Sequence, residues 1–167
     1  MFVLCIKTYS QDLAINEFVS SNDTTIADEN GDYEDWIEIY NYGTSSINLN
    51  GFGLSDQIDN PLKWVFPNIT LGAKEYLLIW ASDKNRSNEN GELHTNFKLK
   101  SGGEAILLSN SNGNTIDESP AVALATDTSY GRNPDGTGNW ATYTTPTPND
   151  SNTGATSAEP EKIAINE

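Results

Sequence analysis

Short runs in which apolar and polar residues alternate recur along the chain, and clusters of turn-forming residues separate them. The clearest run is residues 35–41, with the sequence DWIEIYN. Successive residues of a strand point to opposite faces, so we expect a central strand with Ile37 and Ile39 in the core. Very little of the sequence has helical periodicity. Many short strands at regular spacing predict an all-β protein, either a sandwich or a barrel.

Turn signals mark where the expected strands end, including Asn-Gly at 30–31 and Gly-Gly at 102–103. The best hairpin consists of residues 104–109 and 115–118, because a short polar loop with Asn-Gly joins them. The expected strands are 13–18, 33–42, 46–49, 52–55, 63–66, 75–81, 96–99, 104–109, 115–118 and 128–131.

The first ten residues differ from the rest of the chain. Residues 1–10 begin with an apolar stub, and Thr8 and Ser10 have the small-x-small spacing of a cleavage site. We interpret them as the remnant of an export signal, which predicts an exported protein, extracellular or on the cell surface. The alternative is an N-terminal β-strand, because residues 2–6 are β-prone. Cys5 is the single cysteine, so no disulfide within the chain can form.

The C-terminal end combines a polar segment with a repeated tetrapeptide. Residues 144–160 are rich in Thr, Pro, Asn and Ser, so residues 149–160 are expected to form a linker after a sandwich at 11–148. Ala-Ile-Asn-Glu occurs at 14–17 and again at 164–167. We therefore interpret 161–167 as the start of a second repeat or of the next module. Neighbouring domains of the same polypeptide are then among its partners.

An ordered set of motifs resembles the lamin tail domain over residues 12–148. The set includes INE at 15–17, WIEIYN at 36–41, LNG at 49–51, WVFP at 64–67, YLLIWAS at 76–82, HTNFKL at 94–99, DTSYGR at 127–132 and PDG at 134–136. The resemblance implies an immunoglobulin-like β-sandwich that acts as a module and not as an enzyme. Its last motifs are more similar to the secreted bacterial branch, where the domain accompanies kinases, phosphoesterases and nucleases.

The charge balance excludes several classes of partner. The chain carries 9 Lys and Arg against 24 Asp and Glu, a formal net charge of −15. Nucleic acids and anionic membranes attract cations, so neither is an expected partner. No apolar run approaches the roughly 18 residues of a membrane-spanning helix, so no transmembrane segment is expected. The charge suits solubility, calcium or a basic partner.

The loop before residues 35–41 is the strongest candidate for a metal site. Asp28, Asn30 and Asp32 repeat an oxygen ligand at every second position, and Asp35 is placed to complete the shell. This spacing is typical of calcium loops, although no helix flanks it and the usual acid twelve positions on is missing. The alternative is an acidic loop solvated by water. Asp56 and Asp59 predict a second, weaker calcium site on the same argument.

Other residues invite catalytic or glycan-binding interpretations. Two acids within strands, Glu17 and Glu38, fit a carboxylate-pair hydrolase. Charges in strands are usually paired, however, so these glutamates are expected to pair with Arg132 or to accept backbone hydrogen bonds. His94 is the single histidine, with no Cys or His nearby for zinc and no nucleophile motif. Four tryptophans either stack on sugars or pack the sandwich, and packing is favoured: Trp36, Trp64, Trp80 and Trp140.

The sequence as a whole predicts a noncatalytic extracellular module for adhesion, tethering or protein interaction within a larger exported protein. Its expected partner is a protein or a cell-surface glycan. The alternatives are a calcium-dependent carbohydrate-binding module and an accessory domain of a secreted hydrolase or kinase.

Overall fold

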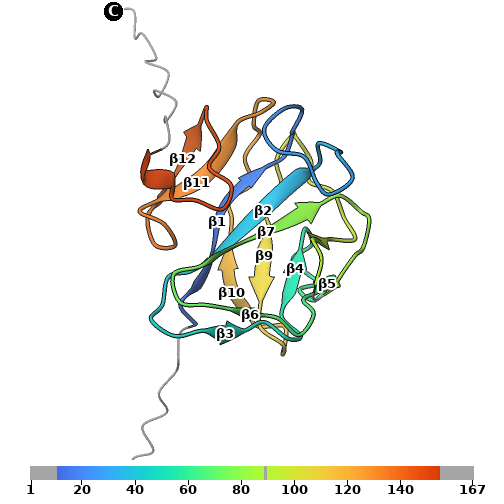
Figure 1. Cartoon of the computed structure of the whole chain (residues 1–167), viewed down its shortest axis with the longest axis vertical. Helices are drawn as coiled ribbons and strands as arrows, with labels where there is room; N and C mark the ends of the chain where they lie inside the picture. The colour runs from blue at the N-terminus through green and yellow to red at the C-terminus, as the bar shows by residue number, and fades with distance from the viewer. Residues whose placement is uncertain (1–10, 89, 155–167) are drawn as a thin grey trace, which may run out of the picture.

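Two main β-sheets pack face to face around one apolar core in the computed structural model, which describes residues 11–88 and 90–154 (Figure 1). The six-stranded sheet has the order β12 (Asn139–Tyr143), β11 (Ser129–Asn133), β1 (Leu13–Val19), β2 (Asp35–Asn41), β7 (Tyr76–Ala81) and β8 (Leu93–His94). The four-stranded sheet has the order β10 (Thr115–Glu118), β9 (Leu107–Ser109), β4 (Gly53–Ser55) and β5 (Trp64–Val65). A small third sheet pairs β3 (Ile47–Asn48) with β6 (Thr70–Leu71).

The prediction of an all-β sandwich is confirmed. Within the described residues the single helical element is the short 3-10 turn η1 (Asn152–Gly154), and no helix there is long and apolar enough to cross a membrane. The expected export remnant at 1–10 and the expected repeat at 161–167 lie outside the described residues.

Strand β2 lies at the centre of the larger sheet, as its sequence predicts. It pairs antiparallel with β1 on one side and with β7 on the other. Ile37 and Ile39 are fully buried in the core between the sheets. The predicted hairpin is also present, since β9 and β10 pair antiparallel with Thr115 opposite Ser109. Its first strand begins at Leu107 and is shorter than expected.

The opposite face of β1 and β2 is buried as well, which alternation alone does not predict. Val19, Trp36 and Trp80 form a second apolar cluster there, with Ile26 and Leu78 packed against it. Glu17 and Glu38 face each other across the two strands and are fully buried. An antiparallel sheet usually leaves one face to solvent, so something must cover these carboxylates.

The covering segment consists of residues 147–152, so it includes the start of the predicted linker at 149–160. Thr147 and Asn149 donate hydrogen bonds to the two glutamates, and Asn152 is fully buried. A Cβ on Gly131 would lie 2.7 Å from Asn152 Nδ2, so the glycine makes room for this side chain. Residues 149–154 therefore belong to the folded body, in contrast to the predicted linker at 149–160. Composition failed here because the polar side chains of the segment are used inside the protein.

Three of the four tryptophans are buried, which supports packing over sugar binding. Trp36, Trp64 and Trp80 are at most 2% exposed. Trp140 is half-buried and stacks on Tyr130, and the guanidinium of Arg132 lies 4.4 Å from the centre of its ring.

Candidate functional site

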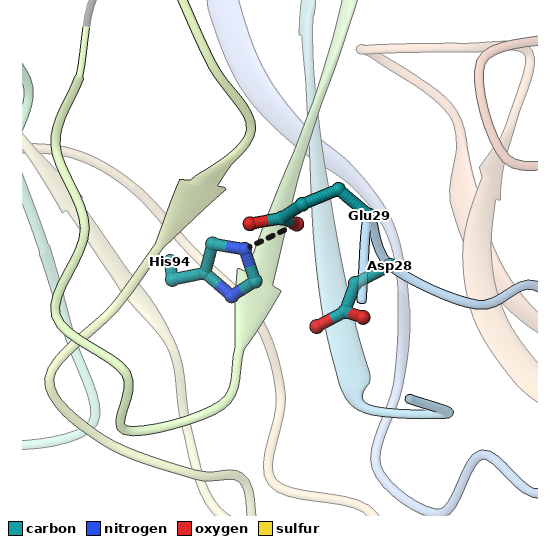
Figure 2. Close-up of side chains that lie close together, drawn as sticks. All are labelled: Asp28, Glu29 and His94. Carbon is teal, nitrogen blue, oxygen red and sulfur yellow. Dashed lines mark hydrogen bonds and ion pairs between the residues drawn. The ribbon is translucent and has the colours of Figure 1, made fainter. Parts of the chain in front are cut away.

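The densest group of charged residues surrounds His94, the single histidine of the sequence. Strand β8 runs parallel to β7, so that His94 pairs with Trp80. The loop before β2 places Asp28 and Glu29 beside it (Figure 2). His94 is fully buried, and its Nε2 lies 2.9 Å from Glu29 Oε2 while its Nδ1 lies 2.8 Å from Ser82 Oγ. Residues far apart in the sequence thus meet at one end of the β7–β8 pair.

Asp28 organises the acidic loop through its buried carboxylate. Its Oδ1 accepts hydrogen bonds from the amides of Asn30, at 2.9 Å, and Asp32, at 3.0 Å. Its Oδ2 pairs with the ammonium of Lys84, which also lies 2.7 Å from Asp32 Oδ2. Burial alone would raise the pKa of Asp28, but the hydrogen bonds from Lys84 and the two amides outweigh it and lower the pKa to about 2.

The predicted calcium ligands are only partly brought together. Asp28 and Asp32 converge, but on Lys84 Nζ, whereas Asn30 contributes its backbone amide to the group. Asp35 begins β2, and burial raises its pKa to about 6. The calcium site stays a prediction, and an ion bound by Asp28 and Asp32 would have to displace an ammonium. In the second acidic loop, Asp56 pairs with Lys63 at 2.7 Å, and Asp59 is exposed.

A different set of three ligand atoms has the dimensions of a metal shell. One oxygen each from Asp28 and Glu29 and one nitrogen of His94 lie within 4.8 Å of one another. Each residue already has protein partners, because Glu29 pairs with Arg86 through its other oxygen and Asp28 pairs with Lys84. Burial, which raises the pKa of Glu29, is outweighed by the His94 hydrogen bond, so the net pKa is lowered. These contacts make the group an ion-pair network that holds the loop to the sheet.

The same network contains a serine, a histidine and a glutamate in hydrogen-bonded series. This order resembles that of a hydrolytic triad, in which the serine oxygen must reach a substrate. Ser82 is 4% exposed, and its hydroxyl also accepts from the Lys84 amide at 3.3 Å. The hydroxyl therefore faces protein atoms, and the series connects β7, β8 and the loop. No sequence motif predicts this series, because Glu29 and His94 are 65 residues apart.

The second group of titratable residues lies under the C-terminal segment. Glu17 accepts hydrogen bonds from Ser129 and Thr147, and Glu38 accepts from Asn16 Nδ2 at 3.0 Å and from the Asn149 amide at 2.6 Å. Asp135 of the PDG motif, for which the sequence predicts no site role, joins them. Its oxygens accept from Asn16 Nδ2, Tyr76 Oη, Ser151 Oγ and the Asn152 amide.

Burial dominates the electrostatics of this second group. It raises the pKa of Glu38 to about 8 and that of Glu17 above its usual value, despite the hydrogen bonds that favour the charged forms. The charges of Glu17 and Asp135 add to the shift at Glu38. A carboxylate-pair hydrolase needs a cleft between its acids. Here residues 147–152 cover them.

Arg132 does not pair with either glutamate. Its guanidinium binds Asp117, with Nη2 2.8 Å from Oδ1, and its Nε donates to the Ile15 carbonyl at 3.0 Å. The expectation that the glutamates accept backbone hydrogen bonds is confirmed, since the amides of Thr147 and Asn149 supply them. The part of that expectation that paired them with Arg132 is wrong. Arg132 instead joins β11 to β10 and β1.

Asp28→Asn is expected to lower the free energy of unfolding at pH 7 by about 1.5–3 kcal/mol, the range for hydrogen bonds to charged groups. The asparagine retains an oxygen for the two amides but leaves Lys84 without its buried partner. The pKa of Asp28 is lowered from 3.8, so its stabilisation is present above that pH and is lost as the pH falls toward 2. Urea unfolding at pH 7 and pH 3 measures both effects. The exposed Asp59→Asn is the control, and equal stability of the two variants at pH 7 would contradict the role of Asp28.

Comparison with known protein families agrees with the fold. A search of curated proteins found no match. A family model described as Lamin Tail Domain matches residues 7–122, more than half of the 167-residue chain. The family consists of immunoglobulin-like, noncatalytic domains that take part in protein interactions. This match, together with the all-β sandwich and the burial of its characteristic strand β2, shows that the chain belongs to the lamin tail domain family.

Proposed function

We propose that this domain is a noncatalytic tethering module that binds a protein partner, within a larger exported polypeptide. One observation carries the proposal: both dense groups of titratable residues hold the fold together. The network around His94 fixes the loop before β2, and the group around Glu38 fixes the C-terminal segment. What remains for function is the surface of an acidic sandwich with a net charge of −15.

The exported setting rests on the sequence alone. The small-x-small spacing at Thr8 and Ser10 supports a cleaved signal, and the repeated Ala-Ile-Asn-Glu supports a string of modules. In the first copy of the tetrapeptide, at residues 14–17, Ile15 is in the core and both Asn16 and Glu17 make buried hydrogen bonds. A second tetrapeptide of this kind supports a second sandwich, because these residues serve the interior of the fold.

A protein is favoured over a glycan as the partner. Sugar binding by stacking needs aromatic faces that are open to solvent. Trp36, Trp64 and Trp80 are buried, and the ring of Trp140 contacts both the Tyr130 ring and the Arg132 guanidinium.

A cell-binding assay tests this function. A fluorescent fusion of the full chain is added to cells of the source organism, before and after protease treatment of the cells. We expect saturable binding in flow cytometry that is lost after protease treatment. Binding that survives protease but not glycosidase treatment would assign the partner to glycans. The absence of saturable binding to any cells would contradict a tethering role.

A further inference from the structure

Strand β7 is only partly paired on its outer side. Along its inner side it pairs with β2 over its whole length, from Tyr76 to Ala81. On its outer side β8 pairs only with Ile79 and Trp80. Among the described residues no strand pairs with Tyr76–Leu78 on that side, so the first half of β7 is an open sheet edge.

The peptide groups of this edge point to the open side. The Asn41 amide donates to the Glu75 carbonyl, so residue 75 faces β2. The direction of the backbone N–H and C=O groups alternates along an antiparallel strand. The backbone groups of Tyr76, Leu78 and Trp80 therefore point away from β2. The bond from the Thr95 amide to the Trp80 carbonyl agrees with this alternation. Tyr76 and Leu78 therefore present backbone groups where a further strand would lie.

Two apolar hollows flank the open edge. One, of about 240 Å³, is lined by Ile69, Leu71, Glu75 and Leu77. The other, of about 300 Å³, is lined by Ile26, Leu78, Trp80 and Glu92. Both are also lined by Tyr76, Leu77, Gly91 and Leu93, so they meet at the strand itself.

The two hollows lie on opposite faces of the sheet. Ile69 and Leu71, which line only the first hollow, belong to the core between the sheets. Ile26, Leu78 and Trp80, which line only the second, belong to the apolar cluster on the other face. A strand added beside β7 would direct its successive side chains to alternate faces. Its alternate residues would thus enter the two hollows in turn. Of the other outer edge strands, β10 (TIDE) carries mainly polar residues, whereas β12 (NWATY) and β5 (WV) also carry apolar ones.

We propose that Tyr76–Leu78 binds an extended segment of a partner protein as an added β-strand. The segment has consecutive apolar residues, one for each hollow, between Lys or Arg residues. Main-chain hydrogen bonds supply affinity in this mode, and the side-chain hollows supply specificity. The basic flanks follow from Glu75 and Glu92, which are exposed at the two hollows of a strongly acidic chain. The inference rests on the proposed protein-binding function and names its site.

Gly91 offers a way to block the site without disturbing the fold. It lines both hollows, and a Cβ built on it would meet nothing closer than 3.8 Å. Gly91→Phe is therefore expected to fold and to fill the hollows. Gly102→Phe is the matched control, because Gly102 is also exposed, has no atom within 4 Å of such a Cβ and lies outside the lining of both hollows.

The probe is a fluorescein-labelled peptide, Lys-Lys-Val-Ile-Val-Ile-Lys-Lys, measured by fluorescence anisotropy with the full chain. We expect Gly91→Phe to weaken binding at least about tenfold, the factor that 1.4 kcal/mol produces, and Gly102→Phe to leave it unchanged. A peptide with alternate backbone N-methyl groups should also bind at least about tenfold more weakly, because it cannot form the ladder. A peptide with Glu in place of Lys should bind more weakly as well.

Three outcomes would overturn the inference. These are equal binding by wild type and Gly91→Phe, equal binding of the N-methylated peptide, or a large gain in affinity when residues 161–167 are deleted. The last outcome would show that residues 161–167 of the chain itself, and not a partner protein, are the segment that binds this edge. Cell binding by Gly91→Phe separates the two proposals. If the variant still binds cells but wild type fails to bind the peptide, the strand-addition site is wrong and the tethering function stands.

Discussion

Glu38→Gln is expected to remove most of the pH dependence of the domain's stability between pH 5 and pH 9. Burial raises the pKa of Glu38 from 4.5 to about 8, and the charges of Glu17 and Asp135 add to the effect. Between these two values the folded protein holds a proton that the unfolded chain has released. Stability is therefore highest at low pH and falls as the pH rises through 8, by about 4 kcal/mol at most over this range.

The variant separates this titration from ordinary packing. Glutamine stays neutral, so the free energy of unfolding of the variant should be nearly the same at pH 5 and pH 9. It has one acceptor oxygen for two donors, Asn16 and the Asn149 amide, so we expect a cost of about 1–3 kcal/mol at pH 5. Urea unfolding at pH 5, 7 and 9 gives both quantities, with the exposed Glu118→Gln as control. Wild-type stability that rises from pH 5 to pH 9 would contradict the buried, protonated Glu38.

The sequence predicted Ile37 and Ile39 well because their signal is local. Alternation over a few residues defines a strand face, and burial of that face follows from the hydrophobic effect. Glu38 lies between them, and alternation predicts a solvated side chain there. Its burial depends on Asn149, which is 111 residues away, and no local pattern reports such a contact.

The candidate metal loop shows the same division between local and distant information. The clustering of Asp28 and Asp32 was visible in the spacing. The cation that pairs with them could not be predicted from the spacing, because Lys84 lies more than 50 residues later in the chain. The partners of His94 were hidden for the same reason, since the parallel pairing of β8 with β7 creates its position. Sequence spacing predicts which oxygen atoms cluster, whereas the tertiary structure determines which cation pairs with them.

Ending the chain at Thr144 is expected to destabilise the domain strongly at pH 5 and only slightly at pH 9. The truncation removes the hydrogen bonds of Thr147 with Glu17, of Asn149 with Glu38, and of Asn152 with the Asn16 and Arg132 carbonyls. At about 0.5–1.5 kcal/mol each, these bonds and those to Asp135 together supply about 5 kcal/mol. At pH 5 little offsets that loss.

At pH 9 the same truncation also relieves an unfavourable interaction. Without residues 145–154, water reaches Glu17 and Glu38, and their pKa values should return toward 4.5. The roughly 4 kcal/mol that the buried charge costs the intact domain at pH 9 is then recovered, so the net effect falls to about 1 kcal/mol. A chain ending at Gly154 retains every one of these contacts and is the control. Equal losses at both pH values would show that the segment adds contacts without setting the pKa of Glu38.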